Sequence, residues 1–100
     1  MTNPNVIHVD PATLRLPPNM SGGADPFKLQ RQIARFGTPI VGMPPLFVYR
    51  GSDGELIIYD GVTRATRVAK FRPGQMVPVE IIGDVKDAGA RLPTIGQRLP

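Results

Sequence analysis

The sequence predicts a small α+β domain, because helical and strand signals alternate along a chain long enough for one hydrophobic core. Two segments carry helix start and stop signals, residues 25–37 and residues 60–70. Strand-like apolar runs lie at residues 6–9, at 46–59 as a hairpin, and at 76–82. With 100 residues, 41% of them apolar, the chain suffices for a single domain with a modest core.

The first predicted element is a short strand at Val6–Val9, which precedes an Asp-Pro pair. Within it, we expect His8 to be half-buried or structural, and a ligand or catalytic role is the less favoured alternative. Residues 14–24 contain a Pro-Pro and a Gly-Gly pair, so an irregular loop is expected there.

The helix at Asp25–Gly37 has the clearest predicted boundaries. Asp25 suits the N-cap, Pro26 the first helical position and Gly37 the left-handed end. The apolar residues at i, i+4 and i+7, which we expect to face the core, are Leu29, Ile33 and Phe36. A second stripe, made of Lys28, Arg31 and Arg35, is basic. This stripe favours a solvated helix face, and the functional alternative is a contact surface for nucleic-acid phosphates.

A hairpin follows a proline-stiffened connection at Thr38–Pro45. Its strands are predicted at Leu46–Arg50 and Glu55–Tyr59, because the Gly-Ser-Asp-Gly sequence between them is typical of a turn. We expect Asp60 to cap the second helix, which ends near Arg72-Pro73-Gly74. The positions of this helix that are expected to pack inward are Ala65, Val68 and Ala69.

The last predicted strand is Met76–Ile82. Pro78 lacks a backbone donor, which places this strand at a sheet edge or places the proline near the strand's start. We assign residues 1–83 to the domain and residues 84–100 to an extended C-terminal tail. The tail has no helical or strand period, so it either packs over the body or hangs free.

Composition narrows the classes of function. The chain has no cysteine, which removes disulfides, thiolate catalysis and Cys-ligated zinc, and its one histidine disfavours a histidine-based metal site. The net charge is +4 and nine of the twelve basic residues are arginine, which favours anionic partners, although solubility alone explains such a charge equally well. No run is long enough to span a membrane and no leader pattern is visible, so a cytoplasmic protein is expected, with a secreted effector as the alternative.

The most informative stretch is the predicted strand-to-helix junction at Asp60–Arg67. A helix start presents free N–H groups and the positive end of the helix dipole, which together favour a phosphate. Gly61 allows a close approach, and Thr63, Arg64 and Arg67 are the candidate phosphate ligands, although Thr63 can equally cap the helix and Arg67 can be a surface charge. This prediction would be overturned if the protein's own side chains filled the junction and left the Arg64 guanidinium held in an internal ion pair.

The order of elements resembles the ParB/sulfiredoxin superfamily, whose domain opens the ParB partition proteins. The resemblance covers about residues 6–83 and rests on an Asp60-Gly61-x-x-Arg64 helix start placed after a hairpin and before a Pro-Val strand. It implies a small α+β domain with a mixed sheet and a phosphate-binding pocket at the start of the second helix. Family members include CTP-binding partition proteins, ATP-using sulfiredoxins, a few small-molecule kinases and nucleases.

The chain departs from the family in ways that limit what the resemblance implies. Sulfiredoxins need a reactive cysteine near the position of Val62, so that activity is excluded. Partition proteins carry Gly-Glu-Arg-Arg where this chain has Gly-Val-Thr-Arg, and their helix-turn-helix domain has no counterpart here, so a full partition clamp is not expected. The Gly-Val-Thr-Arg-Ala-Thr-Arg core and the Arg-Leu-Pro tail are also similar to small domains at the ends of bacterial polymorphic toxins.

Three functions remain open from the sequence. The first is a ParB-like domain that binds DNA, RNA or a nucleotide at the Asp60–Arg67 turn. The second is a nuclease on the same site, with Arg64 stabilising charge and Asp60, Asp10 or His8 activating the attacking oxygen. The third is a protein-interaction domain that has lost the chemistry. A cofactor, either Mg²⁺ or a nucleotide, is open too, but no acidic cluster with metal-ligand spacing supports a metal.

Overall fold

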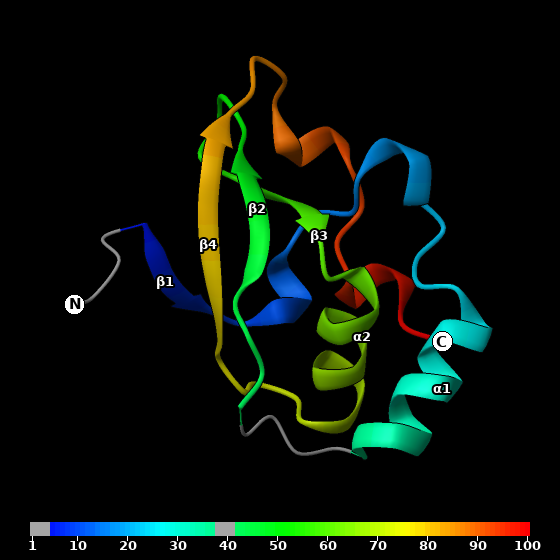
Figure 1. The fold of residues 1–100 in the computed structure, drawn as a ribbon. Coiled ribbons are helices and arrows are strands. Elements are labelled where there is room, and N and C mark those ends of the chain that lie inside the picture. The colour runs from blue at the N-terminus through cyan, green and yellow to red at the C-terminus, as the bar shows by residue number, and fades with distance from the viewer. Residues whose placement is uncertain (1–4, 38–41) are drawn as a thin grey trace.

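The computed structural model describes residues 5–37 and 42–100, so residues 38–41 of the predicted connection lie outside the described part. The strands are β1 (Val6–Val9), β2 (Leu46–Arg50), β3 (Leu56–Asp60) and β4 (Val77–Asp84). The helices are α1 (Pro26–Phe36) and α2 (Val62–Phe71). The 3-10 turns η1 (Pro11–Thr13) and η2 (Pro18–Met20) precede α1, and η3 (Gly89–Arg91) and η4 (Gly96–Arg98) follow β4. The α+β class, the hairpin and the two main helices are confirmed (Figure 1). Within the described ranges, no helix combines the length and apolar character that a bilayer crossing requires.

The four strands form one mixed sheet in the order β1–β4–β2–β3. The pairs β1/β4 and β2/β3 are antiparallel, and β2/β4 is parallel. After the hairpin the chain crosses through α2 and returns as β4 beside β2, as a parallel pair requires. β4 is therefore an interior strand, so the predicted edge position is wrong. Pro78 is its second residue, opposite His8, and the predicted place near the strand start is confirmed.

The hydrophobic core lies between one face of the sheet and α2. Its buried members from the strands are Leu46, Val48, Ile58, Val77 and Val79. Those from α2 include Ala65, Val68 and Ala69, which confirms all three positions predicted to face inward. Figure 1 shows α2 between the sheet and α1, and α1 packs against α2. The molecule thus places its two helices side by side, with the start of α2 directly after the sheet.

Helix α1 has the predicted ends but a narrower buried face than predicted. The Asp25 carboxylate accepts from the N–H groups of Phe27 and Lys28, and Gly37 ends the helix with a positive φ of 65°. Leu29 is buried as predicted, whereas Phe36 is 54% exposed, so its predicted core position is wrong. Because α1 lies outside α2, its last turn extends past the core.

Asp84 is the last residue of β4, one residue beyond the predicted domain boundary, and residues 85–100 pack over the body, which is the first of the two alternatives predicted for the tail. Ile95 is buried in the core, and its N–H donates to the carbonyl of Leu14. Arg15 bridges to Ile57 of β3 on one side and to Thr94 on the other, so both irregular segments continue the sheet beyond β3. The C-terminal segment is interrupted by the 3-10 turns η3 and η4. The segments around Arg15 and Thr94 pack together with the rest of the domain as one unit.

Asp53 in the hairpin turn ties this C-terminal segment to the sheet. Its carboxylate accepts from the N–H groups of Ala90, Gly89 and Glu55 at 2.9, 3.0 and 3.1 Å. The hydrogen bond from Ala90, supported by those from Glu55 and Gly89, lowers the pKa of Asp53 against the opposing effect of burial.

The variant Asp53→Asn is expected to melt at a lower temperature than the wild type near neutral pH, because a neutral amide is a weaker acceptor for three donors. A lowered carboxyl pKa contributes stability above its ordinary value of about 3.9, and that stability is lost as the pH falls through the lowered value. The deficit of the variant should therefore shrink below about pH 4. Thermal melts of both proteins across this range measure it, and a deficit that stays constant with pH would contradict the role of the charge.

Candidate functional site

The junction between β3 and α2 is open at its backbone. Gly61 is the N-cap of α2 and adopts a left-handed conformation with φ 115°, and no side chain caps the helix. The prediction that Asp60 caps α2 is wrong, because Asp60 still belongs to β3, where it pairs with Phe47, one residue too early to reach the first-turn amides. Thr63 likewise makes no capping bond. The positive end of α2 is thus left without a side-chain acceptor within the described residues.

Arg64 stands in the first turn of α2 and is held by the protein at two points. Its Nη1 donates to the carbonyl of Pro44 at 3.0 Å, and its Nη2 lies 3.6 Å from the Asp60 carboxylate. This is the internal ion pair that would count against the predicted site. The pair is long, and the Asp60 side chain is 63% exposed, so water screens the attraction. Arg64 is thereby positioned and only partly neutralised.

Arg67, one turn further on, is buried rather than the surface charge that was one of the two predicted alternatives. Only 3% of the residue is exposed, and its Nε and Nη1 atoms have no hydrogen-bond partner among the described residues. Nη2 lies 3.8 Å from the sulfur of Met43, and the guanidinium lies 5.4 Å from the centre of the Phe36 ring. Burial lowers the pKa of Arg67, and the nearby Arg64 charge lowers it further.

No carboxylate balances Arg67. Across the described residues its contacts are a thioether, an aromatic ring and a second cation, and the eight residues at 1–4 and 38–41 contain no aspartate or glutamate. A buried cation without an anion costs several kcal/mol, of order 3–5 when a partner is removed from an existing pair. A buried arginine without a carboxylate partner is uncommon in folded proteins.

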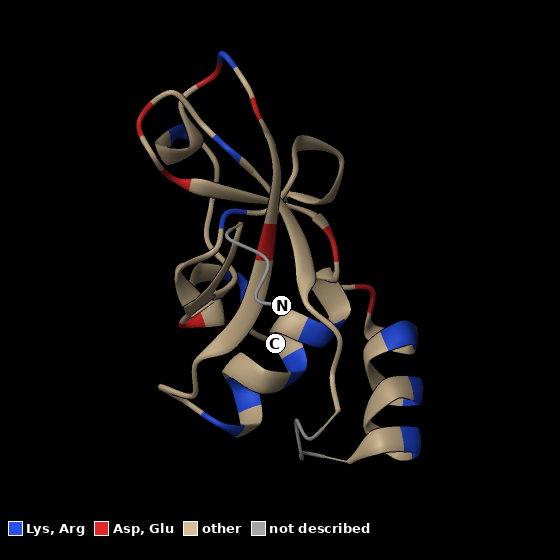
Figure 2. Cartoon of the chain, turned by 60° about the vertical axis from the view of Figure 1, so that its left-hand side comes forward, with Lys and Arg blue, Asp and Glu red and all other residues tan. Residues whose placement is uncertain are grey.

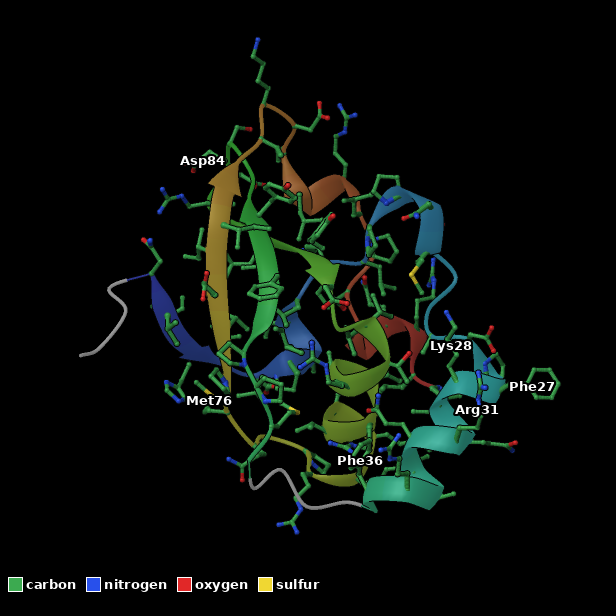
Figure 3. The ribbon with its side chains drawn as sticks, in the orientation of Figure 1. Phe27, Lys28, Arg31, Phe36, Met76 and Asp84 are labelled. Carbon is green, nitrogen blue, oxygen red and sulfur yellow. The ribbon has the colours of Figure 1, made fainter. Side chains whose placement is uncertain are left out.

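The basic stripe of α1 faces the same region. Lys28, Arg31 and Arg35 line a shallow hollow together with Thr63 at the start of α2. Figure 2 shows the basic residues in a row along α1 and further basic residues on α2. Figure 3 places Lys28 near the start of α1, Arg31 near its middle and Phe36 at its end. The structure thus brings both predicted clusters, one from each helix, to a shared surface.

We name this surface the α1–α2 groove and define it by the residues that line three adjoining hollows. From α1 and α2 these are Lys28, Arg31, Gln32, Arg35, Phe36, Val62, Thr63, Arg64 and Arg67. The hollow at the start of α2 has a volume of about 250 Å³ and includes Asp60 and Gly61. A smaller cavity of about 190 Å³, here called the inner cavity, reaches Arg67 between α1, α2 and residues 42–44. Gln32 and Arg64 line both, which makes the groove continuous.

Two of the predicted chemical groups lie elsewhere. His8 is on β1, at the opposite edge of the sheet from β3, and it is exposed rather than half-buried. The Asp10 carboxylate accepts from the N–H of Ala12 and so caps η1. Of the three groups considered as activators of an attacking oxygen, only Asp60 is near Arg64. The described residues contain no group of three His, Asp or Glu side chains that could hold a metal ion.

The other half of the inner cavity was not predicted from the sequence. Gln32, one turn after Lys28 on α1, has a buried Oε1 atom with no partner among the described residues. Phe36 and Met43 form apolar walls around the Arg67 guanidinium. The only signal in the sequence was the i, i+4 spacing of Lys28 and Gln32, which places both side chains on one face of α1. Neither helix sequence shows that α1 packs against α2.

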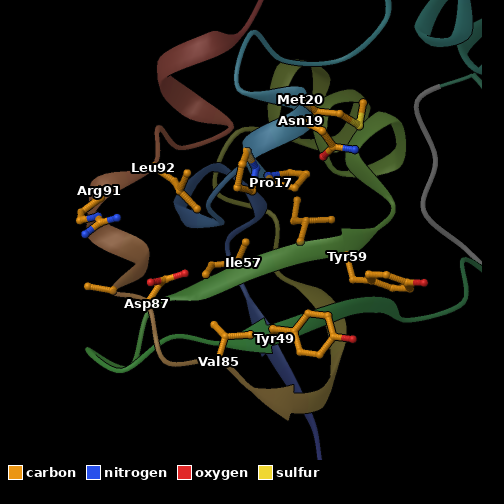
Figure 4. Close-up of a pocket in the computed structure, with 13 residues that line it drawn as sticks. Pro17, Asn19, Met20, Tyr49, Ile57, Tyr59, Val85, Asp87, Arg91 and Leu92 are labelled. Atoms are coloured by element: carbon orange, nitrogen blue, oxygen red, sulfur yellow. The ribbon is translucent and has the colours of Figure 1, made fainter.

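A larger hollow of about 440 Å³ lies beyond β3 and is mostly apolar (Figure 4). Tyr49 and Tyr59 meet edge to face on its wall, with ring centres 5.6 Å apart. Tyr59 and Met20 line both this hollow and the one at the start of α2, so the two adjoin. This hollow could not be predicted from the sequence, because its walls come from segments far apart in the chain.

No protein-family model, curated protein sequence or solved structure matches the chain. The class of protein is therefore defined by its architecture and its site. It is a small α+β domain with two adjacent helices, a four-stranded mixed sheet and a basic groove that contains a buried, unpaired arginine.

Proposed function

We propose that the protein binds a phosphate-bearing ligand, either nucleic acid or a nucleotide, in the α1–α2 groove. The observation that carries this proposal is the buried Arg67 guanidinium, which has no carboxylate partner and lies beside Arg64 and the uncapped start of α2. An anion that enters the groove gains charge-assisted hydrogen bonds from at least two arginines. It also relieves the desolvation cost of Arg67, so that binding is favoured beyond the contacts themselves.

The basic row on α1 supports a polyanion rather than a lone ion. Lys28, Arg31 and Arg35 lie along one side of the groove and add three charges that a strand of nucleic acid can follow. Such exposed contacts give affinity that falls steeply with salt. A nucleotide would use the start of α2 and depend less on this row, so the salt dependence separates the two ligands.

The resemblance to ParB/sulfiredoxin-like domains is consistent with this proposal. The mixed sheet, the hairpin and the glycine-led helix start are the features that the resemblance implies, and we propose a ParB-like domain on that basis. The phosphate ligands proposed in this chain are Gly61, Thr63, Arg64 and Arg67. The missing Glu-Arg pair and the buried Arg67 set this groove apart from that of the partition proteins.

A nuclease at the same site is the second candidate function. It is favoured by one observation, the Asp60 carboxylate 3.6 Å from Arg64 at the mouth of the groove. In that role Arg64 would stabilise charge on the phosphoryl group and Asp60 would activate the attacking oxygen. Binding without cleavage needs only the arginines, so it is the simpler proposal for this arrangement.

A titration with fluorescent single-stranded DNA and RNA, together with thermal shifts in ATP and CTP, tests the proposal. We expect the wild type to bind at least one of these ligands, and Arg64→Gln to lose about tenfold or more in affinity because a charged hydrogen bond is removed. The matched control is Arg50→Gln, whose arginine pairs with Asp84 at 2.7 Å outside the groove and whose loss should leave binding unchanged.

Three outcomes separate the candidate functions. Cleavage of plasmid DNA or total RNA that disappears in Asp60→Asn and in Arg64→Gln assigns the nuclease. Retention on these nucleic acids without cleavage assigns a binding domain. If no ligand in the panel binds or raises the melting temperature, the phosphate proposal is wrong and a protein-interaction domain takes its place.

A further inference from the structure

The inner cavity is too small for a whole ligand and is built for a charged group. Its volume of about 190 Å³ is below the range of about 300–1,000 Å³ in which small-molecule pockets fall. Its walls, Phe36, Met43 and Pro44, are apolar, and its polar groups are those of Gln32, Arg64 and Arg67. The cavity therefore suits the end of a ligand whose remainder lies in the wider groove.

The charge in the cavity exceeds that of one phosphodiester. Arg67 is 3% exposed and has no carboxylate partner. Arg64 lies 3.6 Å from the Asp60 carboxylate, which is mostly exposed to solvent, so the charge of Arg64 is only partly neutralised. The uncompensated charge is thus between one and two positive units. A phosphate monoester carries about −1.5 to −2 at neutral pH, whereas a phosphodiester carries a single negative charge. A monoester matches the two guanidinium groups more closely.

The polar atoms of the cavity that lack partners, together with its small volume, also favour a phosphate monoester over a diester. Arg67 leaves two nitrogen donors, Nε and Nη1, without acceptors, and a phosphate offers several oxygens to satisfy both. The Gln32 side-chain amide, whose Oε1 has no partner, lies in the same cavity, and in the turned orientation its Nε2 donates to a further phosphate oxygen. A diester also carries two chain continuations where a monoester carries one, and a cavity of about 190 Å³ leaves less room for them.

We infer that the inner cavity binds a phosphate monoester through Arg67, Arg64 and Gln32, so that the protein selects ligands with a free phosphate end. The inference rests on the proposed function and names the chemical class of its ligand. The monoester can belong to a phosphorylated strand end or to a free nucleotide, and the exposed basic row on α1 would contact whatever follows a strand end.

The experiment measures the affinity of the full chain for one short single-stranded oligonucleotide in three forms. These forms carry a 5′-phosphate, a 3′-phosphate or only hydroxyl ends, and nucleoside monophosphates, the matching nucleosides and inorganic phosphate are tested as competitors. We expect a phosphorylated form to bind about tenfold or more tightly than the hydroxyl form. Competition by monophosphates but not by nucleosides identifies the free nucleotide as a second source of the group.

Variants then assign the preference to Arg67. In Arg67→Met the phosphorylated and hydroxyl forms should bind equally, at the level that the hydroxyl form has in the wild type. Arg67→Lys should restore part of the preference, because it keeps the charge but loses the two-pronged donor geometry. The matched control is Arg91→Met on η3, an exposed arginine outside the groove.

The outcomes separate this inference from the proposed function. Equal affinity for phosphorylated and hydroxyl ends in the wild type, with binding that still depends on Arg64, overturns the monoester inference and leaves the proposed function standing. A preference that survives in Arg67→Met overturns the role of Arg67. Absence of binding to every probe overturns both.

Discussion

Replacing Arg67 with methionine is expected to raise the melting temperature of the ligand-free protein while it removes the preference for phosphate monoesters. The variant exchanges a buried, unpaired cation for an apolar side chain of similar length. Removing such a charge relieves a desolvation penalty of several kcal/mol, and the lost contact with Phe36 is worth about 1–2 kcal/mol. The net gain is about 2 kcal/mol, which corresponds to roughly 10 °C in a domain of this size.

Thermal unfolding of the wild type and of Arg67→Met without ligand measures this gain. Arg91→Met serves as the control and should change stability by less than about 0.5 kcal/mol, because its arginine is exposed. A destabilised Arg67→Met would mean that the guanidinium is held by Phe36 and Met43 as part of the packing. A stabilised variant that no longer discriminates phosphate ends would instead identify Arg67 as a residue kept for binding at the expense of stability.

The elements that could be predicted from sequence are those whose signals are local. The ends of α1 follow from Asp25 and Gly37, because a capping carboxylate and a left-handed glycine act on neighbouring backbone groups. The hairpin follows from alternating apolar residues on both sides of a glycine-bounded turn. These interactions span a few residues, so the sequence pattern contains all the information that they need.

The features that could not be predicted depend on how distant segments pack. On an isolated helix Arg67 would be a surface charge. It is buried here because α1 and residues 42–44 cover that side of α2. The apolar spacing on α1 predicts a core position for Phe36, but α1 lies outside α2 and about half of the residue is exposed to solvent. Asp60 fails as a cap because the left-handed Gly61 is inserted between it and the helix. In each case tertiary packing overrides the local pattern.

The same glycine gives the second large effect, since Gly61→Ala is expected to destabilise the protein strongly. A left-handed φ of 115° costs an alanine about 1–2 kcal/mol relative to glycine. The added Cβ would also collide with the Cδ2 atom of the fully buried Leu46 and lie 3.2 Å from Nη2 of Arg64. Overpacking of this kind costs a further 1–3 kcal/mol, so we expect a total loss of about 2–5 kcal/mol.

Two other glycines allow the backbone cost and the collision to be measured separately. Gly54 has a φ of 83° and nothing within 4 Å of an added Cβ, so Gly54→Ala should show the backbone cost alone, about 1–2 kcal/mol. Gly22 has neither a positive φ nor a close neighbour, and Gly22→Ala should be neutral or slightly stabilising. Urea unfolding of the three variants gives the free energies. The difference between the losses in Gly61→Ala and Gly54→Ala then measures the cost of the collision with Leu46. Equal losses would mean that the Leu46 side chain moves aside for the added methyl group.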